Sequence, residues 1–62
     1  MKIEQIMECI RALAQCQGSY SRFYAELLEI RENDPKRWEG IIELFESKNF
    51  KDSVDLVMYL EG

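Results

Sequence analysis

The sequence contains no histidine, and its only thiols are Cys9 and Cys16. A structural zinc site needs four Cys or His ligands, so one copy of this chain cannot complete such a site. The two thiols lie in what the pattern described below predicts to be one helix, which separates their Cα atoms by about 10 Å. A disulfide needs Cα atoms within about 7 Å. We therefore expect both thiols to be free, which favours a reducing compartment such as the cytoplasm.

The chain also lacks the motifs of enzymes. Its three glycines form no phosphate-binding loop, and no nucleophile is accompanied by a histidine base. Ser19 and Ser21 have no base nearby in the sequence, and we interpret them as residues at the start of a helix. We expect no catalytic residue, no metal ligand and no cofactor. The protein is predicted to act by binding and not as an enzyme.

Basic residues are few and scattered, because 8 Lys and Arg stand against 12 Asp and Glu and the net charge is −4. Their only adjacent pair is Lys36 and Arg37. A nucleic-acid-binding domain carries a basic patch, so we expect no nucleic-acid partner. Glu4, Glu8 and Arg11 interrupt the apolar residues near the start of the chain, so we expect neither a signal peptide nor a membrane span. These features predict a cytoplasmic protein.

Two segments in the first half of the chain have the apolar spacing of amphipathic helices. In the first segment, residues 3, 6, 7, 10, 13 and 14 are apolar. A break at Gly18 follows, and Ser19 is the predicted N-cap of the second helix. That helix is predicted to end near Asp34, because Pro35 restricts the backbone of the residue before it.

Two further helices are predicted in the second half. Asp34 as N-cap and Pro35 in the first turn mark the start of the third helix. Asn49 is expected to adopt a left-handed backbone in the turn that follows, and Asp52 to cap the last helix. Together the four segments predict an all-α fold, a compact bundle of three to four short helices that forms a single domain over residues 1–62.

The aromatic residues of the second segment, Tyr20, Phe23 and Tyr24, lie within one and a half helical turns. We expect them to pack in the core, with the tyrosine hydroxyls reaching water. The alternative is a hot spot for a protein partner. Nucleic-acid bases are the less favoured partner because no basic groove accompanies the rings.

The last segment, DSVDLVMYLEG, is apolar on two sides. The side that we expect to close the core carries Val54, Val57 and Met58. The second side carries Leu56, Tyr59 and Leu60. Leaving these three in water forgoes about 1.5 to 3 kcal/mol for each large side chain, a serious loss for so small a domain. We therefore predict a homodimer or a higher even oligomer with the second side at its interface. The alternative is that this helix is central in a monomer.

Five charged residues are candidate contacts for a partner or ligand: Arg22, Arg31, Glu39, Glu43 and Glu46. The three glutamates form an acidic stripe on the third segment, for which a solvated face is the simplest interpretation. The sharper hypothesis is that they bind a basic cleft by imitating an acidic ligand. Arg31 lies at the edge of an apolar stripe and is a candidate contact for an anion or carboxylate.

The stretches QGSYSRFYAELLE and KNFKDSVDLVMYLE resemble small proteins encoded by phages and prophages of Gram-positive bacteria. The resemblance implies a non-enzymatic accessory protein that binds and inhibits a bacterial defence protein or its signal molecule. A ubiquitin-associated-type module lacks support, because the expected Met-Gly-Phe loop is absent.

Three functional hypotheses follow from these features. The leading one is a protein-binding inhibitor or adaptor that works as a homo-oligomer. The second is a small-ligand sponge, whose oligomer interface forms pockets lined by Arg31, Arg22 or Tyr59 for an anionic signalling nucleotide. The third is a structural or regulatory adaptor.

Overall fold

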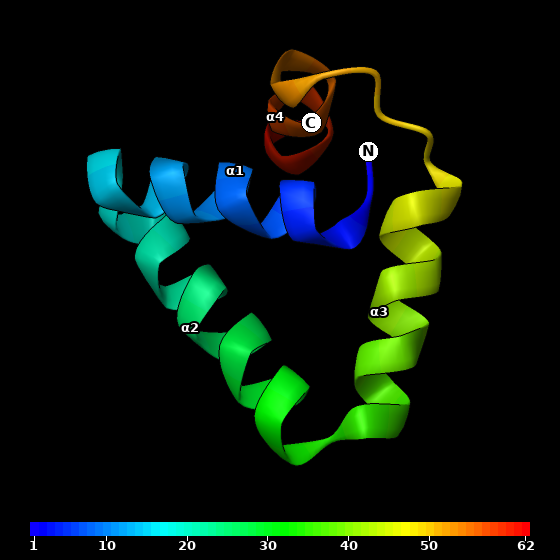
Figure 1. The fold of residues 1–62 in the computed structure, drawn as a ribbon. Coiled ribbons are helices and arrows are strands. Elements are labelled where there is room, and N and C mark those ends of the chain that lie inside the picture. Colours follow the sequence, from blue (N-terminus) through cyan, green and yellow to red (C-terminus); the bar gives the residue numbers. More distant parts are fainter.

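The protein folds into four short helices and no strand, as described by a computed structural model of residues 1–62. The helices are α1 (Ile3–Cys16), α2 (Gly18–Asn33), α3 (Pro35–Ser47) and α4 (Ser53–Glu61). In Figure 1, α1, α2 and α3 outline a triangle, and α4 crosses α1 on the side away from α2. The predicted all-α single domain is confirmed. None of the four helices combines the length and apolar character needed to cross a membrane.

The centre of the fold is α1, whose backbone lies close to each of the other three helices. It supplies half of the eight buried side chains, namely Ile3, Ile6, Met7 and Ile10. These four residues share one stripe of the helix, as the spacing predicts. The other half of the core comes from the rest of the chain: Leu27, Phe45, Phe50 and Leu56. The first helix, and not the fourth, is therefore the one that the others surround.

Most of the predicted helix boundaries are confirmed by the capping geometry. The Oδ1 atom of Asp34 accepts a hydrogen bond from the Arg37 backbone N–H at 3.2 Å, with Pro35 at the next position. The Oδ1 atom of Asp52 accepts from the Asp55 N–H at 3.1 Å. Asn49 has φ of 55°, the left-handed conformation expected for the turn.

The predicted start of the second helix is wrong by two positions. Gln17, and not Ser19, is the N-cap of α2, and no side chain caps this end. The extended backbone of Gln17, with φ of −134° and ψ of 119°, turns the chain between α1 and α2. Its carbonyl accepts from the Tyr20 N–H at 3.1 Å. The start of α2 is therefore fixed by a backbone hydrogen bond of Gln17, and not by a cap from the Ser19 side chain as the sequence predicted.

The orientation of α4 is the reverse of the predicted one. Leu56 is completely buried and Leu60 packs against the core, whereas Val54 and Met58 are 62% and 67% exposed. Leu56 therefore cannot contact a second copy, and its predicted place at an oligomer interface is wrong. Val57, the third residue of the predicted core side, is half-buried at the edge of the contact with α1.

The third member of the predicted interface, Tyr59, is 43% exposed but has partners within the chain. Its ring lies edge to face with Phe45, at 6.4 Å between centroids, and tilted against Phe50 at 5.5 Å. The Lys48 Nζ atom is 5.0 Å from its centroid, a cation–π contact. The side of α4 that remains uncovered is thus the one with Val54 and Met58.

Candidate binding site

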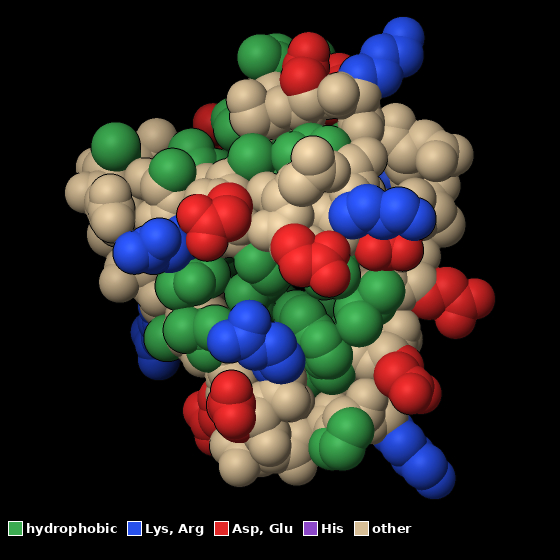
Figure 2. Space-filling view, viewed as in Figure 1, with side chains coloured by type: hydrophobic (Ala, Val, Ile, Leu, Met, Phe, Trp, Pro, Cys, Tyr) green, Lys and Arg blue, Asp and Glu red, His purple; other side chains and the backbone are tan.

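A hollow of about 360 Å³ lies at the face of the triangle between α1, α2 and α3. Figure 2 shows hydrophobic side chains gathered within this triangle, with charged side chains around them. We call this feature the hollow. Its lining residues are Ile3, Glu4, Met7, Glu8, Tyr24, Arg31 and Trp38.

The apolar part of the hollow is continuous with the core. Ile3 and Met7 are buried, whereas Tyr24 and Trp38 are half-buried and pack against the core cluster. Tyr24 precedes the buried Leu27 by one turn of α2, so both residues point toward α1. Trp38 is placed by the same stripe of α3 that buries Phe45 two turns later. The two aromatic side chains are therefore held in position by the core.

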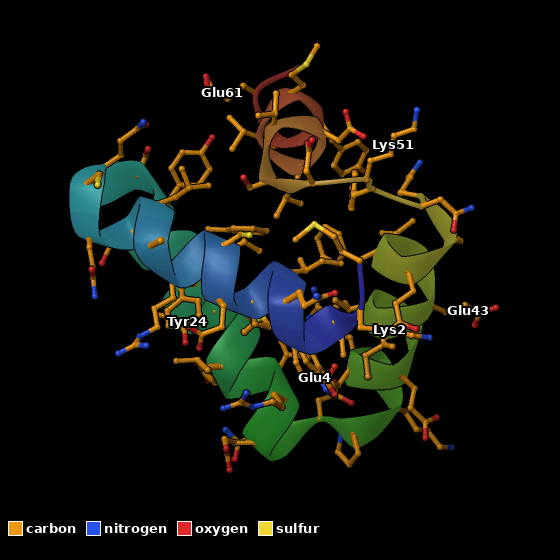
Figure 3. All side chains as sticks on the ribbon, turned by 45° about the horizontal axis from the view of Figure 1, so that its top comes forward. Lys2, Glu4, Tyr24, Glu43, Lys51 and Glu61 are labelled. Carbon is orange, nitrogen blue, oxygen red and sulfur yellow. The ribbon has the colours of Figure 1, made fainter.

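The charged part of the hollow consists of two carboxylates from α1 and one guanidinium from α2. Glu8 pairs with Arg11 at 3.6 Å, and Arg31 pairs with Glu32 at 3.9 Å. Both pairs are exposed and therefore weak. Glu4 forms no ion pair, and Figure 3 shows Glu4 and Tyr24 on the same side of α1. The hollow thus combines aromatic walls, a free carboxylate and an excess of one negative charge.

The predicted arginine contacts are not brought together. Arg31 lines the hollow, but Arg22 lies nine residues earlier on α2. At 3.6 residues per turn, nine residues correspond to a rotation of about 180°, so the two side chains leave α2 on opposite faces. Tyr59 is on α4, and no pocket of the chain contains two of these three residues.

The predicted acidic stripe of α3 is divided by the fold. The Oε2 atom of Glu46 accepts a hydrogen bond from the Ile3 backbone N–H at 2.9 Å, so this carboxylate caps the start of α1. Glu39 and Glu43 are exposed, and Glu43 points away from the body of the molecule in Figure 3. Only these two carboxylates of the stripe remain fully available to a partner.

A second surface feature is an apolar groove of about 450 Å³ between α1 and α4, which we call the α1/α4 groove. It is lined by Glu8, Cys9, Ala12, Leu13, Cys16, Ser53 and Val57. Both thiols are free, Cys9 half-buried and Cys16 exposed. The sequence interpretation missed this groove, although residues 9, 12, 13 and 16 form a second apolar stripe at helical spacing.

The sequence interpretation also missed Glu4, Glu8 and Trp38 as residues of the hollow. Trp38 was not singled out in the sequence, and the two glutamates appeared only as charged residues that interrupt the first apolar segment. Their approach to Arg31 depends on how α1, α2 and α3 cross, which no local sequence signal encodes.

The site contains no arrangement for metal binding, since no three His, Cys, Asp or Glu side chains are grouped to hold an ion. What the fold and the two surface features define is a small all-α domain with an open charged hollow and an apolar groove. The chain shows no match to a protein-family model, to a curated protein or to a solved structure.

Proposed function

We propose that the protein is a non-enzymatic binding module that recognises a protein partner through the hollow. The observation that carries the proposal is the combination of Tyr24 and Trp38 with the unpaired carboxylate of Glu4 and the guanidinium of Arg31. Aromatic residues and arginine are the side chains that most often dominate binding energy at protein interfaces.

The chemistry of the hollow favours a partner segment with a basic side chain. A Lys or Arg head group placed over the aromatic rings gains about 0.5 to 1 kcal/mol from each cation–π contact at an exposed site. Glu4 supplies the opposite charge at the same position. Arg31 then takes a neighbouring carboxylate of the partner, to which its planar guanidinium is suited.

The rival hypothesis of a sponge for an anionic nucleotide has less support. Two carboxylates and one guanidinium line the hollow, so its charge repels a phosphate group. Arg22 leaves α2 on the face opposite to Arg31 and adds nothing there. We therefore choose a protein over a polyanionic small molecule as the ligand.

The resemblance to small phage-encoded proteins supports bacterial defence proteins of the cytoplasm as the first partners to test. Occupation of a basic surface on such a protein would make this chain an inhibitor. The third hypothesis, a structural or regulatory adaptor, uses the same binding site. It differs from the inhibitor only in that the bound partner stays active.

The test is affinity capture from the cells that encode the chain, followed by titration of the purified partner against variants. Glu4→Lys and Arg31→Glu change exposed side chains of the hollow, and Glu43→Lys is the matched control on the outer side of α3. We expect the two hollow variants to bind at least about tenfold more weakly, a loss of about 1.4 kcal/mol. The control should bind as the wild type does.

The opposite pattern would overturn the proposal in favour of the acidic stripe. In that case Glu43→Lys abolishes binding and the two hollow variants do not. Native mass spectrometry of the purified chain tests the sponge directly, because a tightly bound nucleotide adds its mass to that of the protein.

A further inference from the structure

The exposed side of α4 has the pattern of a helix-pairing seam. Val54, Met58 and Glu61 follow the alternating four- and three-residue spacing of a coiled-coil interface along α4, and Lys51 lies in the turn just before the N-cap Asp52. Val54 and Met58 are 62% and 67% exposed, the two most exposed large hydrophobic residues of the chain. Lys51 and Glu61 flank them in the sequence, and Figure 3 shows Lys51 in the turn before α4 and Glu61 near the end of α4. We call these four residues the seam.

We propose that the seam binds a second copy of this chain, with the two α4 helices antiparallel about a two-fold axis. This interface is separate from the hollow and does not depend on the function proposed for it. In the antiparallel arrangement, Val54 lies opposite Met58 of the partner subunit. Lys51 then lies opposite Glu61 of the partner subunit.

The charges of the seam favour a second copy of the chain as the occupant, with the two α4 helices antiparallel. An antiparallel pair joins each Lys51 to an opposite charge and each apolar residue to an apolar one. A parallel pair would place Lys51 against Lys51 of the partner subunit and Glu61 against Glu61 of the partner subunit, which is repulsive. A two-fold contact needs a single self-complementary surface, and the seam provides it.

The apolar surface of α4 continues into a neighbouring groove. The α1/α4 groove, with Val57 on its wall, extends the apolar surface beside the seam. A second copy on the seam therefore covers part of this groove as well.

The size of the seam sets the strength of the dimer. A nine-residue helix is about 13 Å long. Together with the groove, such a face belongs to the class of small interfaces that bury less than about 1,200 Å² in total. We therefore expect a dimer that dissociates on dilution, and Met58 at its centre can adjust its packing because its side chain is flexible.

The test is analytical ultracentrifugation of the complete chain from about 10 µM to about 1 mM, a range that brackets a weak dimer. The wild type should change from 7.4 kDa toward twice that mass. Met58→Glu should weaken association at least about a hundredfold, because it places a charge in the apolar centre. Leu44→Glu is the matched control, since Leu44 is 48% exposed and lies on α3.

A charge exchange tests the antiparallel direction. Lys51→Glu alone should weaken the dimer about tenfold, since it replaces two symmetry-related attractions by repulsions. Adding Glu61→Lys should restore association to within about threefold of the wild type. The double variant places acidic charge just before the start of α4 and basic charge near its end, which suits the helix dipole. Circular dichroism verifies that every variant is folded.

Three results would overturn the proposal. The first is a wild-type chain that remains monomeric at about 1 mM, which would leave the seam to a different protein. The second is a Leu44→Glu variant that dissociates as much as Met58→Glu does. The third is a double charge exchange that fails to restore the association lost in Lys51→Glu, which would exclude the antiparallel pair.

Discussion

The hydrogen bond from the Ile3 N–H to Glu46 joins the start of α1 to the end of α3 across 43 residues of sequence. Ile3 is buried and Glu46 is half-buried, so water replaces this carboxylate poorly. The four N–H groups in the first turn of a helix have no partner within the helix, and a negative charge there also favours the helix dipole. Glu46 is thus a capping residue supplied by a different helix.

Glu46→Ala removes the acceptor and the charge together. Loss of a helix cap costs about 0.5 to 2 kcal/mol, and a hydrogen bond to a charged group contributes about 1.5 to 3 kcal/mol. Because Glu46 is only half-buried, we expect the free energy of unfolding to fall by about 1.5 to 2 kcal/mol. At an unfolding entropy of about 0.13 kcal/mol/K for 62 residues, the midpoint falls by about 12 to 15 °C.

The measurement is thermal unfolding followed by circular dichroism, with Glu43→Ala as the matched control. Glu43 is the same residue type one turn earlier on α3, and it is exposed, so its replacement should change the free energy of unfolding by less than about 0.5 kcal/mol. Glu46→Gln keeps an acceptor but no charge and should lie between the two. Equal midpoints for Glu46→Ala and Glu43→Ala would falsify the reasoning.

Three other perturbations test the fold. Asp34→Ala should lower the free energy of unfolding by about 0.5 to 2 kcal/mol in urea, and an unchanged midpoint would mean that α3 begins elsewhere. Replacing Cys9 and Cys16 together by alanine should cost less than about 2 kcal/mol, since neither is fully buried; a larger loss in the same assay would indicate a covalent or metal link. Leu56→Ala should cost about 2 to 5 kcal/mol in a thermal melt, whereas Met58→Ala should stay within about 0.5 kcal/mol at concentrations that keep the chain monomeric. A larger loss of stability for Met58→Ala than for Leu56→Ala would support the orientation of α4 that the sequence predicted.

Local signals allowed the sequence to predict where three of the helices begin. Asp34 and Asp52 are caps whose partners lie three residues away, and Asn49 adopts its conformation without help from distant residues. The buried stripe of α1 could also be predicted, because its apolar residues repeat at the helical period of 3.6 residues without interruption. Such features depend on neighbours in the sequence and are therefore visible in it.

Contacts between distant residues could not be predicted. In α4, both sides are apolar, so periodicity alone cannot decide which one meets α1, and the structure buries Leu56 while it leaves Met58 exposed. Glu46 was predicted to belong to a solvated stripe. Its hydrogen-bond partner, Ile3, is 43 residues away in the sequence, so no local pattern indicates the contact. The hollow depends in the same way on the crossing of three helices. Arg31 was recognised as a contact, but its neighbours Glu4 and Trp38 were not.

The hollow and the seam lie on different sides of α1, which has consequences for binding. Figure 1 places α4 on one side of α1 and the triangle on the other, and Glu8 lines both the hollow and the α1/α4 groove. A dimer formed through the seam therefore leaves two hollows open.

Two open hollows make binding depend on the number of segments that a partner presents. A partner with two linked basic segments should bind the wild-type dimer about 10² to 10⁴ times more tightly than a single segment does, provided that its linker spans both hollows. Met58→Glu, which removes the dimer but no residue of the hollow, should abolish this gain and leave the affinity for a single-segment peptide unchanged. Isothermal titration with one- and two-segment peptides measures both quantities. A loss of single-segment binding in Met58→Glu would instead show that dimerisation acts on the hollow itself, through the border at Glu8.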